Sequence, residues 1–93
     1  MEWIHNEGKN KGKVILYALS TCVWCNKTKE LLKDLGIEFS YLYVDKLSKK
    51  DFEKVLEDVK HWNPACSFPI IVINDKKCIV GFKENDIREA FKK

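Results

Sequence analysis

The segment from Val14 to Gly36 constrains the fold of this chain more than any other. It opens with a continuous apolar run, Val14 to Leu19, which is typical of a central strand covered on both faces. After Ser20 and Thr21, apolar side chains recur at helical spacing until Gly36, a residue suited to the end of a helix. A buried strand that leads directly into an amphipathic helix predicts an α/β fold.

Later patterns extend this prediction to the end of the chain. Residues 38–44 are rich in aromatic and branched side chains, and the preceding helix makes a parallel βαβ unit the natural arrangement. Ser48 can cap a second helix that ends at Asn63-Pro64. Residues 70–73 and 77–82 predict a hairpin, which a short final helix follows. We therefore predict a four-stranded mixed sheet flanked by three helices, in the order β-α-β-α-β-β-α.

Length and composition favour a single folded unit. A chain of 93 residues, 45% hydrophobic and 33% charged, is long enough for one core and too short for two. The stretch from Asn6 to Lys13 is polar, contains two glycines and lacks apolar periodicity. We expect residues 1–13 to form a mobile lead-in and residues 14–93 to form the domain.

Charge and hydropathy argue against several classes of partner and location. The formal charge is +3, but 17 basic and 14 acidic residues are interspersed, unlike the concentrated field that binds a phosphate backbone. No apolar run approaches the roughly 20 residues of a membrane span, and the opening residues do not resemble an export signal. We expect a monomeric cytoplasmic protein without nucleic-acid or membrane partners.

The four cysteines carry the chemical information. In a cytosolic chain of this size they seldom form a structural disulfide framework, so metal binding or redox chemistry explains them better. Cys22 and Cys25 lie close together where the first predicted strand turns into a helix. Cys66 and Cys78 fall in separate predicted elements, 12 positions apart, which disfavours a zinc site made of all four sulfurs.

The placement of Cys22-Val23-Trp24-Cys25 gives each sulfur a different role. Cys22 lies in the first helical turn, where unpaired amides and the positive end of the helix dipole stabilise a thiolate, so we predict it to be the nucleophile. Cys25 lies about one turn deeper, against the core, where it can reach the Cys22 sulfur but no bulky target. The expected reaction is attack by Cys22 on a target disulfide, followed by attack of Cys25 on the mixed disulfide.

Three motifs together resemble the glutaredoxin branch of the thioredoxin superfamily. They are the cysteine turn, Ser67-Phe68-Pro69 before the third strand, and Gly81-Phe82 before the last helix. The resemblance spans about residues 14–93 and implies the thioredoxin fold. It also implies that Pro69 is cis beside the cysteines and that the backbone of Phe68 holds the target chain. We expect six residues to bind substrate: Trp24, Ser67, Phe68, Pro69, Gly81 and Phe82.

Two departures from the glutaredoxin pattern bear on the electron donor. Glutaredoxins commonly have a lysine three residues before the first cysteine, which helps to bind glutathione, whereas this chain has Leu19. They also commonly carry paired glycines and acidic residues where this chain has Val80-Gly81-Phe82-Lys83. This stretch is similar to glutaredoxin-like redoxins that take electrons from thioredoxin reductase and pass them to ribonucleotide reductase.

Four side chains near these motifs leave alternatives open. Trp24 either offers a flat apolar surface to partner proteins or shields the cysteine turn. Cys66, three residues before Pro69, is either a third redox thiol or a loop cysteine without a partner. Lys27 and Lys29 follow the pair on the same helix, and solvated surface lysines are the favoured interpretation over groups that activate Cys22.

The remaining candidates for metal or catalytic chemistry are given no role. Cys78 lies in a predicted strand and is expected to be a small buried hydrophobic residue. His5 lies in the lead-in and His61 near the end of a helix, so both are expected to face solvent outside any metal cluster or catalytic dyad. We predict no metal site and require no organic cofactor.

These observations predict a dithiol-disulfide oxidoreductase that reduces protein disulfides in cytosolic redox homeostasis. Its partners would be protein disulfides and an electron donor, either a reductase such as thioredoxin reductase or a low-molecular-weight thiol. A glutathione-dependent glutaredoxin is the nearest alternative. An alternative of another class is an iron-sulfur or zinc binding module that uses Cys22, as in some glutaredoxin relatives.

Overall fold

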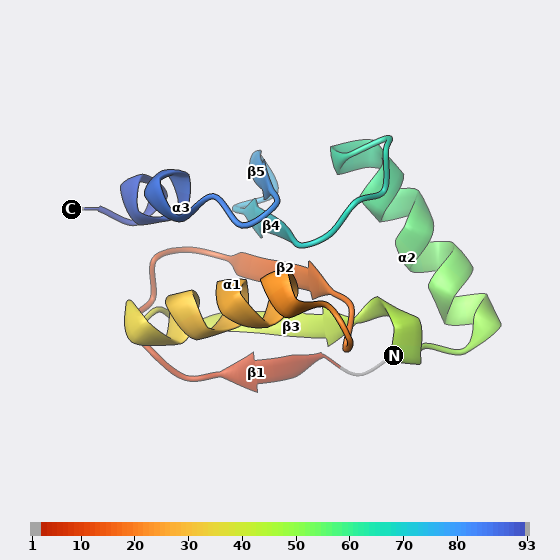
Figure 1. The fold of residues 1–93 in the computed structure, drawn as a ribbon, viewed down its shortest axis with the longest axis horizontal. Helices are drawn as coiled ribbons and strands as arrows, with labels where there is room; N and C mark the ends of the chain where they lie inside the picture. Colours follow the sequence, from red (N-terminus) through yellow and green to blue (C-terminus); the bar gives the residue numbers. More distant parts are fainter. Residues whose placement is uncertain (1–2, 93) are drawn as a thin grey trace.

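The structure, a computed structural model, describes residues 3–92 of the chain. Met1, Glu2 and Lys93, which belong to the predicted lead-in and domain ranges, lie outside the described residues. The elements in chain order are β1 (Ile4–Asn6), β2 (Val14–Ala18), α1 (Val23–Asp34), β3 (Phe39–Tyr43), the 3-10 helix η1 (Val44–Lys46), α2 (Lys49–Trp62), β4 (Ile70–Ile73), β5 (Lys77–Val80) and α3 (Glu84–Ala90) (Figure 1).

The strands form one mixed sheet in the order β1-β3-β2-β4-β5. Strands β2 and β3 are parallel, with Ala18 opposite Tyr43, because α1 crosses between them. Strand β4 runs antiparallel to β2 and forms a hairpin with β5. Asn74 and Asp75 close this hairpin with φ values of 54° and 55°, a conformation that these two residue types tolerate well. The mixed sheet with three helices confirms the predicted fold class.

The sheet has one strand more than the four predicted. Residues Ile4–Asn6 pair antiparallel with β3 and form an edge of the sheet, so regular structure begins ahead of Val14. The sequence pattern does not reveal this strand because it is short and two of its three residues are polar. Its pairing is a long-range contact with β3 rather than a local preference. The mobility expected of the lead-in stays a prediction.

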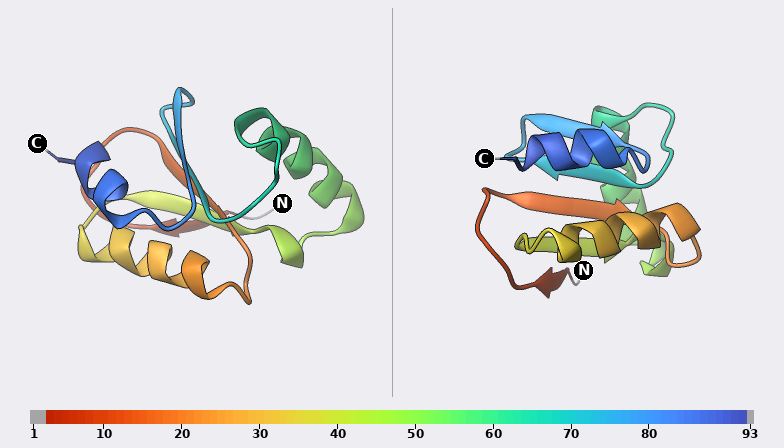
Figure 2. Two further views of the ribbon diagram at one scale, coloured as in Figure 1. Left: turned by 45° about the horizontal axis from the view of Figure 1, so that its top comes forward. Right: turned by 60° about the vertical axis from the view of Figure 1, so that its left-hand side comes forward.

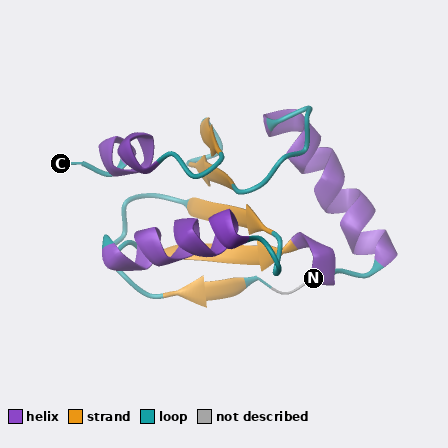
Figure 3. Ribbon diagram, in the orientation of Figure 1, coloured by secondary structure: helices purple, strands orange, loops and turns teal. Residues whose placement is uncertain are grey.

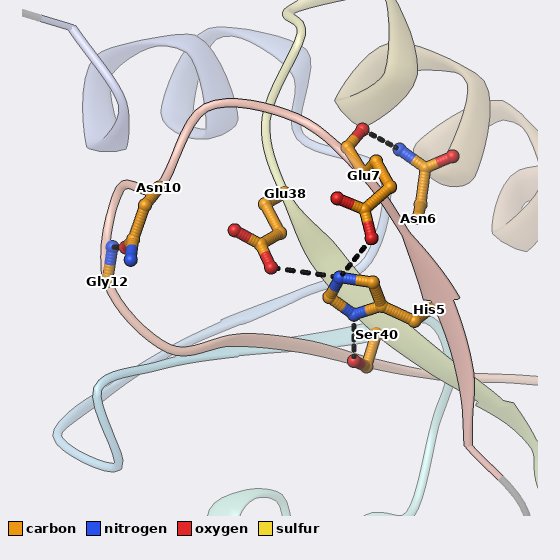
Figure 4. A network of polar contacts seen from close by, with 7 residues as sticks. All are labelled: His5, Asn6, Glu7, Asn10, Gly12, Glu38 and Ser40. Carbon is orange, nitrogen blue, oxygen red and sulfur yellow. Dashed lines mark hydrogen bonds and ion pairs between the residues drawn. The ribbon is translucent and has the colours of Figure 1, made fainter.

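A cluster of polar side chains links β1 to β3 (Figure 4). The Nε2 atom of His5 lies 2.8 Å from a Glu38 carboxylate oxygen and 3.4 Å from one of Glu7, while its Nδ1 atom lies 3.2 Å from Ser40 Oγ. His5 is exposed as predicted, but its ring contacts three polar side chains. Exposed pairs of this kind contribute little individually to stability. Among residues 3–92, His5, Glu7 and Glu38 form the single group of three or more potential metal ligands whose donor atoms all lie within 4.8 Å of one another.

Alternating strand residues face two separate core layers. The first layer contains Leu16, Phe39 and Ile71 from the strands, Leu31 and Leu32 from α1, and Ile87 from α3. The second contains Tyr17, Leu42 and Val72 from the strands, with Val55 and Val59 from α2. Helices α1 and α3 therefore cover one face of the sheet and α2 covers the other. In the right-hand view of Figure 2, α1 and α3 both lie in front of the strands.

Local sequence signals fix both ends of α2. Ser48 caps α2 by accepting a hydrogen bond from the Asp51 backbone N–H at 3.2 Å, as the sequence predicts. Helix α2 ends at Trp62, before Asn63-Pro64. The irregular loop that follows, coloured teal in Figure 3, carries Cys66 to Pro69 back to the start of β4.

Phe39 tests the placement of the first core layer. It is 1% exposed, and its ring centroid lies 5.8 Å from that of Tyr41. Phe39→Ala is expected to lower the free energy of unfolding by about 3–5 kcal/mol, because it removes buried surface and leaves a cavity. Chemical denaturation measures this loss. The matched control is Phe52→Ala on α2, which is 38% exposed and should cost about 1 kcal/mol or less. Equal losses would contradict the placement of the core.

Candidate active site

Cys22 occupies the N-cap of α1. Strand β2 ends at Ala18 and α1 begins at Val23, and the Cys22 Sγ accepts a hydrogen bond from the backbone N–H of Cys25 at 3.1 Å. An N-cap side chain normally supplies an oxygen for this purpose, and here a sulfur takes its place. A thiolate accepts such a bond more strongly than a thiol, and the first turn of α1 contains no acidic side chain to oppose it.

Cys25 lies beneath Cys22 and remains a thiol at neutral pH. It is 1% exposed and belongs to the first core layer. Burial raises the pKa of the Cys25 thiol to about 12, assisted by its hydrogen bond with Cys22, while a backbone hydrogen bond at Leu19 acts in the opposite direction. The two sulfurs thus differ in exposure, as attacking and resolving thiols require.

A hollow of about 280 Å³ lies beside the cysteine turn and is lined by five uncharged residues, Trp24, Phe68, Pro69, Gly81 and Phe82. The structure therefore brings together five of the six residues predicted to bind substrate. The Phe68-Pro69 peptide bond is cis, as the family resemblance implies. The backbone N–H of Gly81 donates to the carbonyl oxygen of Pro69 at 2.8 Å, which joins the two segments of the wall.

Trp24 forms the outer rim of this hollow. Its ring stacks on Phe82 with centroids 5.9 Å apart and an interplanar angle of 26°. The Lys27 Nζ lies 5.1 Å from the Trp24 ring centroid, so this exposed lysine contacts the rim rather than Cys22. Trp24 is nevertheless 55% exposed, and its neighbour Val23 is 64% exposed. This exposure favours the interpretation of Trp24 as a contact surface over that of a shield.

The remaining predicted residues lie outside the hollow. Ser67 is exposed, and its carbonyl and hydroxyl oxygens accept hydrogen bonds from Asn63 Nδ2 at 3.2 and 2.9 Å. Cys66 is half-buried with a φ of 55°, and its sulfur lies 3.7 Å from the Pro64 carbonyl oxygen. Cys78 is half-buried rather than fully buried. A redox role for Cys66 stays a prediction.

A contact that the sequence analysis does not anticipate borders the cysteine turn. The backbone N–H and the hydroxyl of Ser20 donate to the two carboxylate oxygens of Asp45 at 2.8 and 2.5 Å. The Ser20 hydroxyl is the main cause that lowers the pKa of Asp45 from its ordinary value. No sequence pattern links the two residues, which are 25 positions apart. The one available signal is the parallel pairing of β2 and β3, which brings their carboxyl ends to the same edge.

A second groove of about 490 Å³ lies between α1 and α3. Val23, Leu31 and Phe82 form its apolar part, and charged side chains, Lys27 and Glu30 among them, surround it. Because Phe82 lines both the groove and the hollow, apolar surface continues from one to the other.

The glutaredoxin family model matches residues 14–79, a range that includes both cysteines and the cis-proline loop. The chain belongs to the glutaredoxin family. This glutaredoxin is 36% identical over 78 residues to a glutaredoxin-like 8.6 kDa protein in the rubredoxin operon of Clostridium pasteurianum, an alignment that covers 84% of this chain and 96% of the relative.

Solved structures of archaeal proteins are also similar to this glutaredoxin. The glutaredoxin from Methanosarcina mazei Go1 is 55% identical with a TM-score of 0.91, covering 98% of this chain and 88% of that one. Methanosarcina acetivorans methanoredoxin is 50% identical with a TM-score of 0.89, covering 92% and 90%. Family and geometry together make the protein a thiol-disulfide oxidoreductase. Within residues 3–92, no helix has the length and apolar character needed to cross a membrane.

Proposed function

We propose that this glutaredoxin reduces disulfides of other proteins through Cys22 and Cys25 and receives its electrons from a reductase of the thioredoxin reductase kind. The observation that carries the proposal is the half-buried sulfur of Cys22, which accepts a backbone hydrogen bond and lies above a buried Cys25 thiol and beside an uncharged hollow. This role implies a reducing compartment such as the cytoplasm.

The catalytic cycle follows from the difference between the two thiols. The Cys22 thiolate attacks one sulfur of the target disulfide, and the other target sulfur leaves and takes up a proton. Cys25 Sγ then bonds to Cys22 Sγ as its proton is lost, which expels the second target sulfur. The target gains two electrons, and the glutaredoxin is left with a Cys22–Cys25 disulfide that the donor must reduce.

The lining of the hollow supports a polypeptide rather than glutathione as the preferred ligand. None of its five lining residues is charged, whereas glutathione carries two carboxylates. Leu19 stands where glutaredoxins commonly have a glutathione-binding lysine, and it packs against the second core layer instead. The neighbouring Lys27 lies over the Trp24 ring. Apolar side chains next to a target cysteine suit such a surface.

A comparison of donors tests this proposal. Reduction of insulin would be followed through NADPH consumption, once with thioredoxin reductase and once with glutathione and glutathione reductase. We expect turnover with thioredoxin reductase and little above background with glutathione. Efficient turnover with glutathione alone would replace the proposal by the glutathione-dependent alternative. Turnover with neither donor would contradict the proposed electron source.

Trp24 is expected to contribute to binding of the target protein. Trp24→Ala should raise KM for insulin about five- to tenfold, because it removes an exposed aromatic contact beside the hollow. Reaction with a small disulfide such as Ellman's reagent should change little, since the cysteine turn stays intact. Trp3→Ala is the matched control, because Trp3 is also exposed and belongs to the N-terminal segment. An unchanged KM in Trp24→Ala would show that targets do not use this rim.

A further inference from the structure

The turn that presents Cys22 depends on support from outside itself. Residues 19–22 connect β2 to α1, and one backbone hydrogen bond closes them, from the Cys22 N–H to the Leu19 carbonyl oxygen at 3.2 Å. Thr21 is exposed at its tip. The position of the Cys22 sulfur relative to the Cys25 amide is therefore sensitive to whatever fixes this turn to the sheet.

Asp45 makes that connection. It lies in η1, directly after Val44, which is 0% exposed and anchors η1 in the second core layer. Because β2 and β3 are parallel, both segments leave the sheet at the same edge, just beyond the pair Ala18 and Tyr43. The carboxylate accepts both donors of Ser20, the backbone N–H at 2.8 Å and the hydroxyl at 2.5 Å. A two-point contact restricts both the position and the orientation of the turn.

We propose that Asp45 is a positioning residue for the redox reaction, acting through Ser20 to hold the turn in the conformation in which the Cys22 sulfur receives the Cys25 amide hydrogen bond. Asp45 is placed to orient the nucleophile indirectly, because its carboxylate oxygens accept from Ser20 while the Cys22 sulfur accepts from the Cys25 amide. Misplacement of a reacting group by a small distance is costly in enzymes. The inference rests on the Cys22–Cys25 chemistry and is independent of the electron donor.

Charge and position predict opposite effects when Asp45 is replaced. The Asp45 charge raises the pKa of the Cys25 thiol, so removal of this charge by itself favours thiolate formation at the cysteine pair and should accelerate its reactions. Loss of the hydrogen bonds should loosen the turn, weaken the amide bond to the sulfur and slow those reactions. The direction of the change therefore distinguishes a positioning residue from a simple charge.

Three variants of the full chain separate these effects. Asp45→Ala removes charge and acceptors, and Asp45→Asn removes the charge but keeps an oxygen for the Ser20 N–H. Ser20→Ala keeps the charge and loses one of the two bonds. Glu57→Ala, which removes an exposed carboxylate from α2, is the matched control. The readout is the rate of alkylation of Cys22 by iodoacetamide against pH in the reduced protein, with the alkylated residue identified by mass spectrometry and folding checked by thermal unfolding.

We expect alkylation near neutral pH to be about five- to tenfold slower in Asp45→Ala and about two- to threefold slower in Ser20→Ala. The pH profile of both should move to higher pH. Asp45→Asn should react at the native rate or faster, and Glu57→Ala at the native rate. If Asp45→Ala does not fold, a native or faster rate in Ser20→Ala, or a slower rate in Asp45→Asn than in Ser20→Ala, would overturn the positioning role.

Two results would overturn the positioning role. A native or faster rate in both Asp45→Ala and Ser20→Ala would leave Asp45 as a charge or a purely structural group. An Asp45→Asn variant as slow as Asp45→Ala would show that the hydrogen-bonded geometry is not what matters. Because alkylation needs no partner protein, failure here is distinct from failure of the proposed donor or target.

Discussion

Cys22→Ser is expected to lower insulin reduction by at least about 10³-fold, to the rate of the dithiothreitol that supplies the electrons. A serine hydroxyl does not ionise near neutral pH and forms no bond of useful stability with a target sulfur. The fold should survive, because serine is a preferred N-cap and its oxygen can accept the Cys25 N–H in place of the sulfur. The melting temperature should therefore equal or exceed that of the native protein, which separates loss of chemistry from loss of structure.

Cys66→Ser is the matched control for this result. Cys66 is also half-buried, but it lies outside the hollow and donates to a backbone carbonyl. Near-native activity is expected if Cys22 and Cys25 suffice for the cycle. A large loss in Cys66→Ser would instead give this thiol the redox role that the sequence leaves open. Substantial activity in Cys22→Ser would refute the assignment of the nucleophile.

Cys25→Ser should stop the cycle after the first step and reduce steady-state turnover of a protein disulfide with thioredoxin reductase by about 10²-fold or more. The variant still forms the mixed disulfide, because the attacking sulfur is unchanged, but a hydroxyl cannot displace the target from it. A rapid first phase followed by a stall is the expected time course. The matched control is Cys78→Ser, whose sulfur lies at Trp62 rather than at the active site. Unimpaired steady-state turnover in Cys25→Ser would mean that a resolving thiol is not needed.

The parts of the fold that the sequence predicts are those determined by local patterns of apolar and capping residues. The apolar run at Val14 and the helical spacing after Cys22 determine β2 and α1. The cap at Ser48 marks the start of α2. Since the cysteine motif lies between the first two elements, its position at the helix N-terminus follows directly, and with it the different environments of the two sulfurs.

The parts that sequence does not predict depend on contacts between distant residues. Strand β1 has little apolar character of its own and is defined by its pairing with β3. The contact between Ser20 and Asp45 exists only because two parallel strands end side by side. Ser67 illustrates the opposite error, in which a motif predicts a binding residue that the structure places elsewhere. Its side chain accepts a hydrogen bond from Asn63, and it does not line the hollow.

The most direct test of the account is to find which sulfur forms the mixed disulfide with a target. Cys25→Ser would be incubated with insulin, free thiols would be blocked, and the adduct would be digested without reducing agent and mapped by mass spectrometry. The account predicts a target peptide joined to Cys22, and no such adduct in a Cys22→Ser, Cys25→Ser double variant. A target peptide joined to Cys66 or Cys78, or the absence of any adduct, would contradict the mechanism.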